Sequence, residues 1–179
     1  MIGDFNIFDT LKVVNAEIRH SNFLGWLFNP KESHNLGSFF IHNFLKQFIS
    51  QNKSQINDIS IFDIEGYEYT DIEIRREWQN IDLMVIIREK NKQVVLVIEN
   101  KIKTGEHSNQ LTRYWEKVEN EFKNEIKLYI FLSPESGIPS NENWIPGDYV
   151  FISSLLDTIL TAKKDQIGSE ILLFIEHYN

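Results

Sequence analysis

The chain has 179 residues, of which 42% are hydrophobic and 13% aromatic, and it contains no cysteine. This composition excludes a disordered chain, disulfides and thiolate zinc sites, and no apolar run approaches the roughly 20 residues that cross a membrane. The 18 Lys and Arg residues against 26 Asp and Glu give a formal net charge of −8, which argues against binding nucleic acid by bulk electrostatics but allows local phosphate contacts. We expect one domain over residues 1–179. The absence of a signal-peptide pattern favours a cytoplasmic protein.

Two helices are predicted before the first strand. The first covers residues 9–28, where Asn29-Pro30 stops it. The second spans residues 37–51 and has a phenylalanine-rich apolar face. Together they predict a helical layer that precedes a sheet in the chain.

Three strands are predicted at 71–78, 81–88 and 93–100. A polar stretch separates the last two, and a turn centred on Lys90-Asn91 makes them antiparallel with Arg88 opposite Gln93. A helix at 108–123 and a buried strand at 128–133 follow, and this order implies a crossover to a parallel neighbour.

The C-terminal part is predicted to hold one more strand and one or two helices. YVFIS at 149–153 has the composition of a strand, with Ser153 or Ser154 capping a following helix, and a last amphipathic helix ends near Tyr178. The element order describes an α/β sandwich around a mixed sheet.

A pair of carboxylates is the most informative feature of the sequence. In the expected register Asp82 lies opposite Glu99, where side chains are roughly 5 Å apart and like charges destabilise the sheet. Lys101 points to the same face because strand side chains alternate. Two carboxylates and a lysine around one point suit a divalent metal and an anionic substrate. Either acid alone would be read as an ordinary strand-end residue or a cross-strand salt bridge, and the joint placement favours a site.

Three further residues are candidates. Glu17 falls within the apolar stripe of the first helix, where an unpaired charge is costly, although a hydrogen bond to His20 or Ser21 would also account for it. Gln110 and Tyr114 share one face of the helix after the Glu99 strand, which by itself is a weak signal. A lone histidine before a helix, such as the one at position 34, is more often a cap or a surface residue than a ligand.

These residues resemble the PD-(D/E)xK nuclease superfamily, which includes many restriction endonucleases and RecB-like exonucleases. The superfamily pattern is an acid on one strand and Asp/Glu-x-Lys on the next, here Asp82 and Glu99-Asn100-Lys101. Glu17 fits the helix glutamate of many members, and Gln110 and Tyr114 match the RecB-like Gln-x-x-x-Tyr motif. HSNFLGWLFNP, HNLG, IENKI and QLTRY are similar to a bacterial branch of the superfamily. The proline of the family name is absent, because Asn80-Ile81 precedes Asp82, and this variation is common.

The resemblance implies a restriction-endonuclease-like α/β/α sandwich with a central mixed sheet and a divalent-metal-dependent nuclease acting on nucleic acid, with DNA favoured. Glu17, Asp82, Glu99 and the backbone carbonyl of Asn100 would bind Mg²⁺ or Mn²⁺. Lys101 would orient the attacking water, Gln110 would position Lys101 or the substrate, and Tyr114 would pack beside it. A homodimer is compatible with the resemblance, since many relatives pair to cut both strands.

Other classes stay open at this point. An inactive nuclease-fold module that binds nucleic acid or a protein partner is the main alternative, and the negative charge slightly favours it. A structural subunit with a salt-bridge cluster and a hydrolase of another phosphoester are the others. The sequence leaves open DNA or RNA, endo- or exonuclease action, sequence specificity and pathway.

Overall fold

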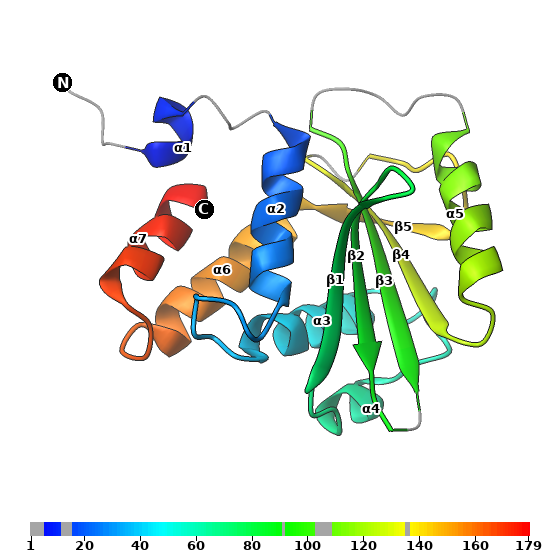
Figure 1. The fold of residues 1–179 in the computed structure, drawn as a ribbon, viewed down its shortest axis with the longest axis horizontal. Coiled ribbons are helices and arrows are strands. Elements are labelled where there is room, and N and C mark those ends of the chain that lie inside the picture. The colour runs from blue at the N-terminus through cyan, green and yellow to red at the C-terminus, as the bar shows by residue number, and fades with distance from the viewer. Residues whose placement is uncertain (1–5, 12–15, 91, 103–108, 135–136) are drawn as a thin grey trace.

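A computed structural model describes residues 6–11, 16–90, 92–102, 109–134 and 137–179. The chain forms a five-stranded sheet and helices that precede, interrupt and follow it (Figure 1). The strands are β1 (Asp71–Trp78), β2 (Ile81–Arg88), β3 (Gln93–Asn100), β4 (Ile126–Ser133) and β5 (Trp144–Asp148). The helices are α1 (Ile7–Thr10), α2 (Glu17–Phe28), α3 (Phe39–Gln51), α4 (Ile61–Glu65), α5 (Gln110–Glu121), α6 (Tyr149–Lys163) and α7 (Ser169–Tyr178).

The sheet is mixed, with strand order β1-β2-β3-β4-β5. β1, β2 and β3 are antiparallel neighbours, whereas β3, β4 and β5 run parallel. Arg88 pairs with Gln93 and Leu83 with Ile98, which is the predicted register of the central hairpin. The parallel pairing of β4 with β3 across α5 confirms the predicted crossover.

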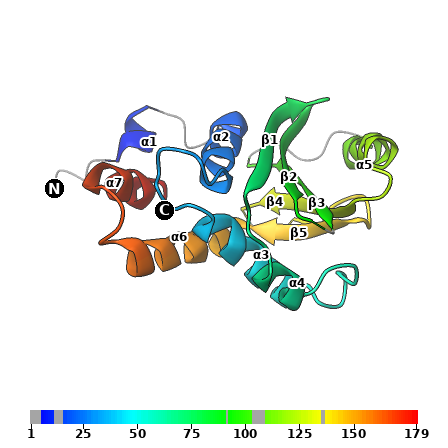
Figure 2. The same ribbon diagram turned by 60° about the horizontal axis from the view of Figure 1, so that its bottom comes forward.

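Helices cover both faces of the sheet (Figures 1 and 2). One core cluster joins α2, α3 and α6 to alternate residues of β2 and β3, including Leu83 and Ile98. The other joins α5 to the opposite face, including Met84 and Val97. These three layers are the predicted α/β sandwich with a restriction-endonuclease-like arrangement. Among the described residues, no helix is long and apolar enough to cross a membrane.

The predicted N-terminal helix at 9–28 is wrong as one continuous element. The structure has α1 and α2 there, and residues 12–15 between them lie outside the described part, as do Asn91 of the predicted turn and residue 108 of the helix predicted at 108–123. The predicted strand at 149–153 is also wrong, because this segment begins α6. Asp148 caps it by accepting a hydrogen bond from the Phe151 N–H at 2.7 Å, so neither Ser153 nor Ser154 is the cap.

The turn between β1 and β2 sits directly before Asp82. Gln79 and Asn80 form a two-residue loop between the paired Trp78 and Ile81, and both have positive φ, at 51° and 71°. A type I′ hairpin turn requires positive φ at both central residues, where glycine and asparagine are preferred.

Replacing Asn80 by glycine should therefore stabilise the fold by about 0.5 kcal/mol, since glycine adopts positive φ without a steric penalty. Thermal unfolding measures the effect. Asn120→Gly, an exposed position inside α5, is the matched control and should destabilise by a similar amount because glycine is a poor helix former. Equal losses in both variants would contradict this interpretation of the turn.

Candidate active site

The ends of β2 and β3 bring Asp82 and Glu99 together. Their register places them side by side beyond the paired Leu83 and Ile98. Asn100 N–H donates to Asp82 Oδ2 at 2.8 Å, and Asp82 N–H lies 3.5 Å from Glu99 Oε2. Glu99 is 1% exposed, so its charge is almost completely removed from water. Each carboxylate is thus held by the backbone of the neighbouring strand.

Lys101 is the cation of this cluster. Its Nζ lies 3.0 Å from Glu99 Oε1 and 3.7 Å from Glu17 Oε2, and its side chain is 10% exposed. A buried charge requires a partner of opposite sign, and here one ammonium group serves more than one carboxylate.

Glu17 reaches the cluster from α2, of which it is the first residue. Its Oε1 accepts a hydrogen bond from Ile102 N–H at 2.9 Å, and its side chain remains 27% exposed. The sequence placed Glu17 in an apolar stripe that included Val13 and Val14, which lie outside the described residues. In the structure Glu17 is at the edge of the cluster near solvent, where its charge is less costly than in the core.

Gln110 and Tyr114 approach from α5 on the other side of the sheet. Gln110 Nε2 donates to Glu99 Oε1 and to Tyr114 Oη, each at 2.9 Å. Gln110 Oε1 is buried and has no hydrogen-bond partner among the described residues. The structure therefore brings all six predicted side chains into one connected cluster, with an acceptor left available beside Glu99.

Burial and mutual repulsion shift the pKa values of the acids. Burial, followed by the charge of Asp82, raises the pKa of Glu99 to about 7, despite Lys101. Burial also raises the pKa of Asp82, although the Asn100 N–H and Lys101 oppose this. Burial acts to lower the pKa of Lys101, but the surrounding carboxylates outweigh it and the pKa is raised. Lys101 therefore stays cationic, while one lysine is insufficient for the acids around it.

This donor set fits a hard divalent cation. Asp82 and Glu99 supply two carboxylates at one point, and oxygen is the donor that Mg²⁺ and Mn²⁺ prefer. Burial and the neighbouring charge of Asp82 disfavour the ionised form of Glu99, and a bound cation would favour that form. Among the described residues, no group of three or more His, Cys, Asp or Glu side chains is arranged to hold a metal. A complete ligand set would thus need backbone oxygen or water in addition to the pair.

Stability should fall as pH rises because of Glu99. The pKa of Glu99 in the folded state, about 7, exceeds the ordinary value of 4.5, so the folded state binds the proton more tightly than the unfolded state does. The stabilisation that this proton gives is lost as pH rises from about 4.5 to 7. The loss is on the order of 3 kcal/mol. In metal-free buffer, Glu99→Gln should raise the melting temperature at pH 8 and flatten its pH dependence. A variant that melts lower than wild type at pH 8 would show that Lys101 compensates Glu99 fully.

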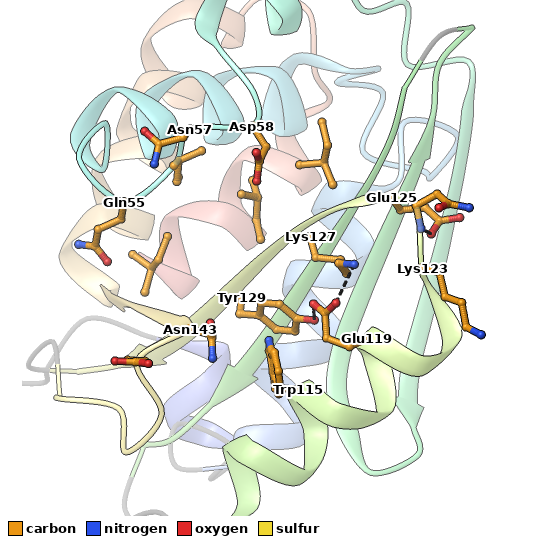
Figure 3. A pocket seen from close by; sticks show the side chains of 16 residues that line it. Gln55, Asn57, Asp58, Trp115, Glu119, Lys123, Glu125, Lys127, Tyr129 and Asn143 are labelled. Atoms are coloured by element: carbon orange, nitrogen blue, oxygen red, sulfur yellow. Dashed lines mark hydrogen bonds and ion pairs between the residues drawn. The ribbon is translucent and has the colours of Figure 1, made fainter.

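Described residues also line a pocket away from this cluster, at the far end of α5 (Figure 3). It has a volume of about 810 Å³ and is lined by Lys127, Tyr129 and Glu119, among others. Glu119 accepts a hydrogen bond from Tyr129 Oη at 2.8 Å and pairs with Lys127 Nζ at 2.9 Å. None of the six candidate side chains, all described, lines it. Glu119, Tyr129 and Lys127 bond one another there and the pocket holds none of the candidate residues, so the carboxylate cluster is the stronger candidate for chemistry.

Sequence reasoning missed part of the surroundings. The Asn100 side chain is hydrogen-bonded to Ser21 and to the half-buried Tyr149 behind the cluster. Only the proximity of Ser21 to Glu17 in the sequence hinted at this, and Tyr149 was expected in a strand. The expectation that His34 is a cap or surface residue is wrong. It is fully buried: its Nε2–H donates to the Trp26 and Asn29 carbonyls, each at 3.0 Å, and its Nδ1 accepts from Leu36 N–H at 2.9 Å.

The chain was compared with known proteins. The family model of the PD-(D/E)XK nuclease superfamily matches residues 5–175, almost the whole chain. No curated protein and no solved structure matches significantly.

Proposed function

Because the chain belongs to the PD-(D/E)XK nuclease superfamily, we propose that it is a divalent-metal-dependent nuclease that hydrolyses phosphodiester bonds, with DNA as the favoured substrate. The observation that carries the proposal is the pairing of half-buried Asp82 with buried Glu99, with Lys101 Nζ 3.0 Å from Glu99 Oε1. The proposal treats the chain as one domain and keeps a cytoplasmic location and a homodimer as expectations.

The acids and one backbone group would hold Mg²⁺ or Mn²⁺. Asp82 and Glu99 supply carboxylate oxygens, the Asn100 carbonyl adds a neutral oxygen, and Glu17 contributes directly or through water. The ion would lower the pKa of a bound water and offset charge on the phosphate. The backbone N–H groups of Asn100 and Ile102 hold Asp82 Oδ2 and Glu17 Oε1, and Glu17 Oε2 lies 3.7 Å from Lys101 Nζ, so both carboxylates are fixed in orientation at the cluster.

The remaining residues would act on water and phosphate. Lys101 stays protonated, so it serves as a hydrogen-bond donor to the attacking water and to phosphate oxygen rather than as a base. Gln110 holds Glu99 Oε1 through Nε2 and offers Oε1 to Lys101 or to water, while Tyr114 anchors the amide. Water adds to phosphorus and gives up a proton to solvent, the bond to the 3′ oxygen breaks, and the 3′ oxygen takes up a proton and leaves as a hydroxyl, so that a 5′-phosphate remains.

Cleavage assays test this proposal directly. Supercoiled plasmid and single-stranded DNA are incubated with the protein in Mg²⁺, in Mn²⁺ and in EDTA. We expect nicking or degradation that requires the metal and leaves 5′-phosphate ends. Cleavage that continues unchanged in EDTA would contradict the proposed chemistry.

A non-cleaving binding module is the second candidate. Two observations favour it: the net charge of −8, and the engagement of Glu99 Oε1 by both Lys101 and Gln110. In this case the cluster is a closed salt bridge that needs no cation. Failure to bind Mg²⁺ or Mn²⁺, together with no cleavage of either DNA, would favour this function.

A further inference from the structure

The Asn100 side chain points to the face of β3 opposite to that of its sequence neighbours Glu99 and Lys101, and it is held there by hydrogen bonds. Glu99 and Lys101 are bound to each other, whereas the Asn100 amide contacts α2 and α6. Asn100 is 0% exposed, and its N–H also donates to Asp82 Oδ2. Any rotation of this residue would thus move the backbone that holds Asp82 and would displace the residues on either side.

Ser21 ties the Asn100 amide to the helix that carries Glu17. Asn100 Nδ2 donates to Ser21 Oγ at 2.5 Å, and Ser21 Oγ donates to the Glu17 carbonyl at 3.0 Å. Ser21 is 2% exposed, so water does not compete for these bonds. The first turn of α2 is therefore fixed to the end of β3 by two consecutive hydrogen bonds.

Tyr149 closes the other side of the amide. It is the first residue of α6, and its Oη donates to Asn100 Oδ1 at 3.2 Å. Its ring also contacts His20 of α2, with centroids 5.5 Å apart.

We propose that Tyr149 and Ser21 are positioning residues, which clamp the Asn100 amide from α6 and α2 and so fix Asp82, the Asn100 carbonyl and Glu17 relative to one another. This inference rests on the proposed function, because the groups that it positions are the proposed metal ligands. Partners of metal ligands typically affect metal affinity about 10- to 100-fold when removed. The clamp acts through a neutral amide and touches neither metal nor substrate.

The test is Mn²⁺ binding by calorimetry to Tyr149→Phe, which removes one hydroxyl. Tyr129→Phe is the matched control, since it removes a buried hydroxyl that bonds Glu119 at the far end of α5. We expect Tyr149→Phe to weaken Mn²⁺ binding about tenfold and Tyr129→Phe to leave it within twofold. Ser21→Ala should also weaken Mn²⁺ binding about tenfold. The double variant should weaken binding by less than the product of the two single-variant effects, because both side chains act through one amide.

The outcomes separate this inference from the proposed function. A wild type that binds no Mn²⁺ overturns both. A wild type that binds, with Tyr149→Phe and Ser21→Ala unchanged in affinity, overturns the clamp alone, even if their melting temperatures fall. Equal weakening in Tyr149→Phe and Tyr129→Phe likewise overturns the clamp, because it would reflect general stability.

Discussion

An Asp82→Asn variant is expected to lose Mn²⁺ binding and to cleave DNA about a thousandfold more slowly than wild type, or slower. The substitution keeps the shape of the side chain and an oxygen for the Asn100 N–H, which Asp82 Oδ2 accepts at 2.8 Å. It removes the negative charge that a divalent ion needs, and metal stabilisation of a developing phosphate charge contributes several kcal/mol to a reaction. Initial rates of plasmid cleavage at saturating Mn²⁺ measure the effect.

Glu119→Gln is the control for this experiment. Glu119 is also a partly buried carboxylate paired with a lysine, but it lies at the far end of α5. Its replacement should leave the cleavage rate within about twofold, as expected for a position away from the chemistry. A rate for Asp82→Asn within tenfold of wild type would show that Asp82 is not part of the reacting site.

The Lys101→Met variant should separate catalysis from metal binding. Lys101 is proposed to donate hydrogen bonds to water and phosphate, and loss of one such donor costs about 10²- to 10³-fold in rate. Mn²⁺ affinity should be unchanged or higher, because the variant removes a cation 3.0 Å from Glu99 that competes for the same carboxylate. Single-turnover cleavage and calorimetry on the same samples give both quantities.

Lys127→Met provides a close match for Lys101→Met. Lys127 is similarly buried, with a side chain 12% exposed, and pairs with Glu119 at 2.9 Å. The Lys127→Met variant should be less stable than wild type, but the cleavage rate per folded molecule should be unchanged. If Lys101→Met binds Mn²⁺ much more weakly than wild type, or if both lysine variants slow cleavage equally, the assigned role of Lys101 is wrong.

The central sheet was predictable because its signals are local. Near-continuous apolar runs predicted β2 and β3, and the length of the short polar turn between them predicted the register that pairs Leu83 with Ile98. That register in turn predicted the proximity of Asp82, Glu99 and Lys101. The proximity of these side chains thus follows from the β2–β3 hairpin, which the apolar pattern of the sequence predicts.

The C-terminal half was less predictable for physical reasons. β5 contains Pro146, which argues against a central strand but is accepted at a sheet edge, where β5 lies. The apolar run from Tyr149 is too short to distinguish a strand from a buried helix, and the capping side chain of Asp148 decided it. The position of Ile81 was not predicted either. Strict alternation along β2 would place Ile81 on the same face as Leu83, but Ile81 belongs to the core cluster of α5 and Leu83 to the cluster on the other face.

The chain of hydrogen bonds behind the site could not be read from the sequence. Ser21, Asn100 and Tyr149 are far apart in the chain, and each is an ordinary residue in its local context. Only the packing of α2 and α6 on one face of the sheet brings them together (Figure 2). The acids were recognised because charge in an apolar strand is unusual, whereas a neutral amide gives no such signal.

The most direct test of the account is a calorimetric titration of Mn²⁺ into the wild-type protein and Asp82→Asn at pH 8, without nucleic acid. At this pH Glu99, with a pKa of about 7, is ionised and able to bind the ion. We predict saturable binding to the wild type that Asp82→Asn loses. Absence of binding to the wild type, or equal binding to both proteins, would contradict a metal site built on Asp82 and Glu99.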